Sequence, residues 1–324
     1  MEATGEETLA AGEQTLADEQ RRRAQAGAAA IAAGILTIAG GALAALIYSD
    51  LPTVPVLDSL RERLAPNAPE PGLKALQVRW YDDNAVKLIL VSIVLALAAA
   101  AIGLTLSHLY RSAKARRPEL SRNLVIAAIA GAVLVAISGI VQAIGVSIEA
   151  ASFAGSADQT SEAAGDVLQS PVVVAALLLR QIGVFALGFA FVMLALNAMR
   201  VGLLTRFMGV LGIIVGVLFI VPLGSSLPIV QAYWLVALGV LFLGRWPSGQ
   251  PPAWVTGVAQ PWPTQQQLRE ARLERQGDAA AESDSEPKPR GTSRERAEAP
   301  ETPAPEMPER RPHPSSKKHR RKRR

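Results

Sequence analysis

One arginine stands well inside an apolar stretch of the sequence, and it is the residue best placed to do chemistry. Arg180 lies about nine residues from the beginning of the stretch at 171–198, which is roughly 13 Å along a helix. A charged side chain at the centre of a membrane helix costs about 2.5–3.5 kcal/mol to insert, so such a residue commonly serves a function. Arg180 is therefore the first candidate for a functional site.

A stripe of small and polar residues on the preceding apolar stretch offers partners for this guanidinium. The residues recur at helical spacing: Gly131, Ser138, Gln142, Gly145 and Glu149. Gln142 falls at a depth similar to that of Arg180, so we predict a hydrogen bond between these two side chains, with Glu149 within further reach. The group would be a structural clamp, an arginine that extends to the headgroups, or an anion- or substrate-binding site in a water-filled cleft.

Residues for catalysis or metal binding are scarce. The chain has no cysteine, which excludes disulfides, thiolate metal sites and thiol nucleophiles. Its histidines are His108, His313 and His319, and no apolar stretch holds an Asp or Glu in its core that could complete a metal site, an aspartyl dyad or a proton relay. We therefore expect no enzymatic activity, no catalytic residue, no metal and no cofactor.

Six long apolar stretches must position the candidate residues, near 27–48, 86–108, 123–147, 171–198, 207–223 and 228–244. A helix needs about 20 apolar residues to cross a hydrocarbon core of about 30 Å, where its backbone groups must be paired internally. We predict an all-α fold, a polytopic membrane bundle of six transmembrane helices over residues 27–246. A cytoplasmic leader at 1–26 and a disordered basic tail at 247–324 complete the chain.

The last two stretches are short, and Pro222 and Pro228 bracket their connection. They form either two thin spans or a re-entrant hairpin, and both arrangements return the chain to the same side. Two spans are favoured, because a re-entrant backbone needs protein or water around its unpaired groups.

The charges of the loops predict an orientation. Basic residues precede the first stretch at 21–23 and fill the loop at 111–122, whereas the loop at 149–166 carries acidic charges alone. The positive-inside rule then places both termini in the cytoplasm. The Ala-, Gly- and Arg-rich composition suggests a bacterium, so we expect its plasma membrane. A cleaved signal peptide is the alternative for the first stretch.

The first outer loop, residues 49–85, is rich in proline, which precludes long regular structure. Its residues 57–64 could form one short interfacial helix. Tyr48, Trp80 and Tyr81 fit the aromatic belt expected at a membrane surface.

Glycines on the fifth stretch predict close helix packing. Gly209, Gly212 and Gly216 share one helical face, and the last two form a GxxxG pattern. We expect packing within the chain, with formation of a homo-oligomer as the alternative.

The tail after residue 247 is too polar to offset its ordering entropy by burial. It ends in a basic cluster: Lys317, Lys318, Arg320, Arg321, Lys322, Arg323 and Arg324. A cytoplasmic cluster of this kind gains about 1 kcal/mol per residue near anionic lipid. We expect it to bind anionic lipid headgroups or an acidic cytoplasmic partner, and the absence of interleaved aromatics argues against specific nucleic-acid recognition.

Two segments have recognisable motifs. The first runs from Asn197 to Gly212 and contains Met-Arg-x-Gly-Leu-Leu-x-Arg, and the second is Gly-Arg-Trp-Pro at 244–247 with the following Pro-Pro-Ala-Trp. In these segments the chain resembles a group of uncharacterised bacterial six-span membrane proteins catalogued only as a domain of unknown function. The resemblance covers about residues 27–263 and implies a topology, but neither an activity nor a site.

The sequence as a whole favours a non-enzymatic membrane scaffold or accessory protein whose basic tail meets lipid or a cytoplasmic partner. The alternative is a small permease or channel in which Arg180, Gln142 and Ser138 line an intramembrane cleft.

Overall fold

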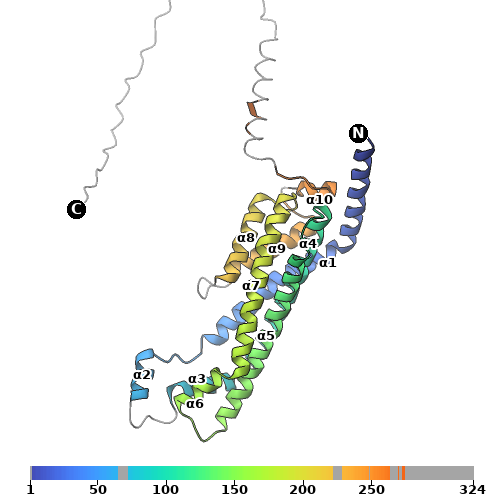
Figure 1. The fold of residues 1–324 in the computed structure, drawn as a ribbon. Coiled ribbons are helices and arrows are strands. Elements are labelled where there is room, and N and C mark those ends of the chain that lie inside the picture. Colours follow the sequence, from blue (N-terminus) through green and yellow to red (C-terminus); the bar gives the residue numbers. More distant parts are fainter. Residues whose placement is uncertain are drawn as a thin grey trace, which may run out of the picture. The chain divides into compact units, whose positions relative to one another are not determined.

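The computed structural model describes residues 2–64, 72–221, 228–247 and 249–262, with the isolated positions 269, 272 and 273, and the regular elements of this part of the chain are all α-helices (Figure 1). The long helices are α1 (Glu2–Tyr48), α4 (Ala85–Arg116), α5 (Asn123–Ala154) and α7 (Pro171–Arg200). The shorter ones are α2 (Val56–Leu64), α3 (Leu73–Asp83), α6 (Ser161–Leu168), α8 (Arg206–Ile220), α9 (Ile229–Phe242) and α10 (Pro252–Thr256). All of them belong to the unit Met1–Thr264.

Four of these helices are long and apolar enough to cross a membrane: α1 over Gly12–Tyr48, α4, α5 and α7. The helical fold is thus confirmed, but the six predicted spans are not. Helices α8 and α9 contain 15 and 14 residues. At 1.5 Å per residue each is only about 22 Å long, which is short of a hydrocarbon core of about 30 Å.

Six helices pack as a closed ring, in the order α1, α4, α5, α7, α8 and α9, so that the first of them meets the last. The core of the ring holds large buried side chains, among them Phe191, Trp234 and Phe242. The indole N–H of Trp234 on α9 donates a hydrogen bond of 2.8 Å to the Met208 carbonyl of α8. This bond satisfies the polar atom of a fully buried aromatic side chain.

Glycines mark the closest approaches between neighbouring helices of the ring. A Cβ atom added to Gly131 would lie 2.9 Å from the Gly183 carbonyl oxygen, and one added to Gly183 would lie 3.0 Å from that of Gly131. Gly188 and Gly216 oppose each other in the same way at 2.8 and 2.9 Å. Since side chains essentially never approach backbone so closely, a larger residue at these positions would force the helices apart.

The glycines singled out on α8 all face neighbours within the chain. Gly216 opposes Gly188, Gly212 lies against Ala195 and the Trp234 ring, and Gly209 lies against Met199. This arrangement matches packing within one molecule.

The hairpin of α8 and α9 covers only part of α7. Ile220, the last residue of α8, lies against Gly188. Helix α7 continues from Gly188 to Pro171, about 25 Å at 1.5 Å per residue. The uncovered part of α7 contains Arg180, and its apolar residues Leu178 and Ile182 are 62% and 57% exposed.

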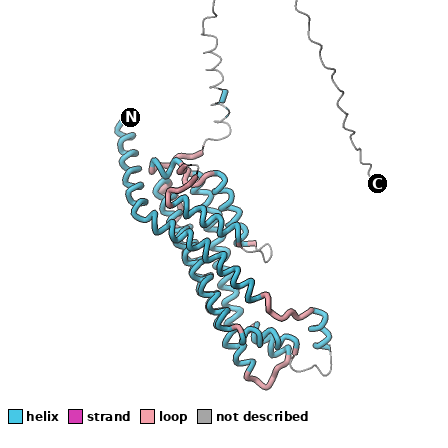
Figure 2. The backbone as a smooth tube through the Cα atoms, turned by 180° about the vertical axis from the view of Figure 1, so that it is seen from behind, coloured by secondary structure: helices cyan, strands magenta, loops and turns pink. Residues whose placement is uncertain are grey.

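One end of the helix ring carries a cap made of α2, α3, α6 and the loops that join them (Figures 1 and 2). The carboxylate of Glu62 accepts hydrogen bonds from the Leu73 amide (3.0 Å) and the Ser161 hydroxyl (2.8 Å), which ties α2 to the beginnings of α3 and α6. The expected short helix at 57–64 is present as α2, whereas α3 was not expected in a proline-rich loop.

The opposite end of the ring, which we call the arginine end, carries Arg22, Arg23, Arg111 and Arg116. There the chain stays folded beyond the expected boundary at 246. Residues 249–262 pack on the loop between α7 and α8, and Ala253 and Trp254 are buried. Residues 249–262 are therefore packed rather than part of a disordered tail, because tryptophan side chains supply apolar burial that the overall composition of this region conceals. Most of the later residues lie outside the described part of the chain.

Candidate ligand-binding cavity

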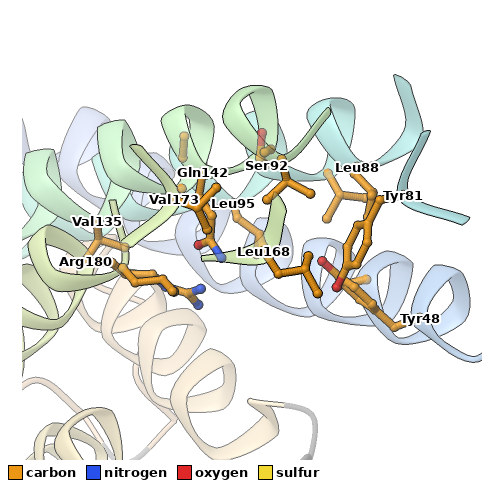
Figure 3. A pocket seen from close by; sticks show the side chains of 17 residues that line it. Tyr48, Tyr81, Leu88, Ser92, Leu95, Val135, Gln142, Leu168, Val173 and Arg180 are labelled. Carbon is orange, nitrogen blue, oxygen red and sulfur yellow. The ribbon is translucent and has the colours of Figure 1, made fainter. Parts of the chain in front are cut away.

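A cavity of about 470 Å³ lies between α1, α4, α5 and α7, on the side of the cap (Figure 3). Its apolar wall is formed mainly by aliphatic side chains: Leu88, Val91, Leu95, Val135, Val146, Leu168, Val173 and Leu177. Its polar lining consists of Tyr48, Tyr81, Ser92, Gln142 and Arg180. Cavities of this size and composition hold small molecules in many proteins.

Arg180 is the charged residue of this lining, and its side chain extends from α7 into the cavity (Figure 3). Within the described part of the chain no hydrogen bond or ion pair engages its guanidinium. A guanidinium offers five N–H donors in a rigid fork that suits carboxylate and phosphate groups. The cavity therefore presents an uncompensated positive charge to whatever enters it.

The other polar groups are neutral and sit at different depths. Gln142 projects from α5 beside the guanidinium, whereas Tyr48 and Tyr81 lie together at the cap end of the cavity (Figure 3). Burial and the neighbouring Tyr48 phenol raise the pKa of Tyr81, so its hydroxyl stays a neutral hydrogen-bond donor at physiological pH. The Ser92 hydroxyl already donates to the Ile89 carbonyl at 2.7 Å.

The geometry separates the four residues of the predicted polar site. Arg180 and Gln142 line the same cavity, but the hydrogen bond expected between them is absent from the described residues. Ser138 is buried, donates to the Val135 carbonyl at 3.3 Å and does not line the cavity. Glu149 also lies outside the lining, about two helical turns farther along α5.

Sequence reasoning missed the part that Tyr48, Tyr81 and Ser92 play in the lining. The tyrosines were interpreted only as an aromatic belt, and their position at the ends of apolar helices was the available signal. The place of Tyr81 in the lining depends on how α3 folds back over the bundle, which no local pattern in the sequence records.

A second set of polar contacts stabilises the arginine end. The Arg116 guanidinium is fully buried and pairs with both carboxylate oxygens of Glu19, one of them at 3.0 Å. It also donates to the Ala253 carbonyl at 2.7 Å, and its charge lies over the Trp254 ring at 5.3 Å. Because each group is satisfied by another, this cluster is structural.

The two segments that carry the resemblance contact each other at this end. The indole N–H groups of Trp254 and Trp262 donate to the carbonyls of Leu203 and Leu204, each at 2.8 Å. Gly202 has a positive φ of 80°, and a Cβ atom there would lie 2.0 Å from the Gln260 carbonyl oxygen. Only glycine fits this backbone, which accounts for the Gly-Leu-Leu spacing.

Metal binding finds no support in the described residues, which contain no group of three or more His, Asp or Glu side chains near one another. The basic cluster at 317–324 lies outside the described residues.

No family model, curated protein or solved structure matches the chain.

Proposed function

We propose that the chain is a non-enzymatic membrane protein that binds an amphipathic anion, a carboxylate or phosphate with an apolar body, in the cavity beside Arg180. The observation that carries this proposal is the free guanidinium inside a cavity whose remaining wall is apolar or neutral. Arg180 is exposed to the open cavity, so an anion can reach its guanidinium, pair with the charge and fill the rest of the space with its apolar body.

The proposal includes a topology. We place the protein in the plasma membrane of a bacterium, with both termini and the arginine end in the cytoplasm and the cap outside. In place of six full spans, α1, α4, α5 and α7 cross the bilayer, and the α8–α9 hairpin enters from the cytoplasmic side and returns. The lengths of α8 and α9 and the contact of Ile220 with Gly188 support this arrangement.

The first experiment uses a fluorescent fatty acid, 11-(dansylamino)undecanoate, with the full chain in phosphatidylcholine nanodiscs. Dansyl emission rises when the probe enters an apolar site. A hydrogen bond to a charged group is worth about 1.5–3 kcal/mol, so Arg180→Gln should weaken binding by about 10- to 150-fold. Arg180→Lys should restore part of the affinity, because the charge returns without the planar fork.

Two controls make the result specific. Arg61→Gln removes a charge from the cap, where the Arg61 side chain is 81% exposed, and should leave binding unchanged. The methyl ester of the probe keeps its apolar body without the negative charge and should bind wild type and Arg180→Gln alike. Equal binding of the acid to wild type and Arg180→Gln would refute the proposal.

The scaffold role expected from the basic tail stays a prediction, as do homo-oligomerisation and membership of the six-span group. Binding of the full chain to anionic liposomes, compared with a variant in which Lys317, Lys318 and Arg320 are glutamine, would test the tail separately from the cavity.

A further inference from the structure

A groove at the arginine end has a basic mouth and an apolar floor. It encloses about 600 Å³ between α1, α4 and α5. It lies nearer the arginine end of these helices, whereas the Arg180 cavity lies nearer the cap. Arg22, Gln25, Ser107, His108 and Arg111 line one end of it. The rest of the lining is apolar and reaches Ala29 on α1 and Ala100 on α4.

The length of the groove corresponds to one leaflet. From Arg111 to Ala100 the α4 backbone rises about 16 Å at 1.5 Å per residue. Half of a hydrocarbon core of about 30 Å is about 15 Å. A molecule with its charged head at Arg111 and its apolar tail at Ala100 would therefore match the depth of a single phospholipid chain.

The charges at the mouth are available to a ligand. Within the described residues neither Arg22 nor Arg111 forms a hydrogen bond or an ion pair, and both are exposed. The nearest carboxylates, Asp18 and Glu19, line the adjoining pocket, and Glu19 is held by the buried Arg116. Asp18 offsets only part of the positive charge.

His108 forms part of the wall that the groove shares with the adjoining pocket. The residue is 7% exposed, and it lines both the groove and the adjoining pocket. Its ring packs edge-on to Phe242 at 4.8 Å, whereas its Nε2 atom is buried without a hydrogen-bond partner. Because this buried nitrogen has no exposed surface to offer a ligand, the headgroup contacts are assigned to the two arginines.

We propose that this groove binds one anionic phospholipid, with the phosphate between Arg22 and Arg111 and an acyl chain along the α1–α4–α5 floor. Basic pockets between membrane helices on the cytoplasmic side recognise anionic headgroups in this manner. The site is distinct from the Arg180 cavity and does not depend on the function proposed for it.

Native mass spectrometry of the full chain, with dioleoylphosphatidylglycerol and dioleoylphosphatidylcholine as competing lipids, tests the proposal. The wild type should retain phosphatidylglycerol in preference to phosphatidylcholine. In the double variant Arg22→Gln/Arg111→Gln this preference should fall about thirty-fold. Each basic residue contributes about 1 kcal/mol near anionic lipid, and about 1.4 kcal/mol corresponds to a tenfold change in affinity. Both arginines are exposed, so the variant should fold normally.

The charge-matched control is Arg21→Gln/Arg200→Gln, which removes two exposed arginines outside the groove lining and leaves the C-terminal basic cluster intact. This control should keep the wild-type preference. If both double variants lose it equally, the lipid is attracted by diffuse surface charge and the site does not exist.

A further variant separates a lipid from a soluble anion. Leu104→Trp places a bulky ring in the apolar floor and should reduce phosphatidylglycerol retention without changing the charge. Added inorganic phosphate at millimolar concentration should not displace the lipid. Displacement by phosphate, together with full retention in Leu104→Trp, would overturn the assignment of a lipid site.

Discussion

Replacing Gly131 by alanine tests whether the contact between α5 and α7 is as close as the structure has it. The new Cβ atom would lie 2.7 Å from the Leu187 amide nitrogen and 2.9 Å from the Gly183 carbonyl oxygen, and both are backbone atoms that cannot rotate away. Overpacking of this kind costs about 1–3 kcal/mol. Gly139, two turns along the same helix, has no atom within 4 Å of an added Cβ and provides the matched control.

Both substitutions gain the same intrinsic helix preference of alanine over glycine, about 1 kcal/mol. The difference between them therefore isolates the steric contact. We expect Gly131→Ala to be less stable than Gly139→Ala by about 1–3 kcal/mol, or by roughly 3–9 °C in thermal midpoint at about 3 °C per kcal/mol. Circular dichroism in detergent during heating or titration with dodecyl sulfate measures the difference. Equal midpoints for the two variants would show that α5 and α7 are not in contact at Gly131.

Three other changes are predicted from the contacts described above. Glu19→Gln breaks a buried ion pair and should lower the unfolding free energy by about 3 kcal/mol, whereas Asp58→Asn, at an exposed pair, should change it by less than about 1 kcal/mol in the same unfolding assay. Trp254→Phe leaves a buried carbonyl without its donor and should cost about 1–3 kcal/mol, measured by the same titration. Gly139→Cys faces the open cavity and should react with a membrane-impermeant maleimide in intact cells. Ser156→Cys is the outside control and should be labelled as well. Labelling of Ser156→Cys without labelling of Gly139→Cys would mean that water does not reach the cavity.

The sequence predicts the helical segments of the ring well, because continuous apolar runs leave a membrane-length chain few alternatives to helix. It also brings Arg180 and Gln142 to one place, since depth along a helix follows directly from residue number. What it cannot provide is the rotation of each helix about its axis. Ser138 and Gln142 are one turn apart, yet the first is buried and the second lines the cavity.

Contacts between residues far apart in sequence account for the other differences. The Glu62 carboxylate joins the helices of the cap by accepting hydrogen bonds from Leu73 and Ser161. These partners lie far from Glu62 in the sequence, so a proline-rich loop gives no local sign of the contacts. The segment 249–262 has the composition of a flexible tail. Two indole N–H groups fix it to the carbonyls of Leu203 and Leu204 in the loop between α7 and α8, and the direction of these carbonyls follows from the loop conformation rather than from local composition.

Closure of the ring has a consequence for how the protein is made. Arg116 bonds to partners 97 residues before it and 137 residues after it, and α1 packs against α9, the last helix of the ring to be synthesised. At about 5–20 residues per second the ribosome needs roughly 7–30 s between Arg116 and its final acceptor. Throughout that interval the nascent α1 lacks the helix that will cover Gly27 and Gly34, which in the folded chain lie against Gly239 and Val236 of α9. A newly inserted chain would thus depend on the insertion machinery to shield its first helix until its last has arrived.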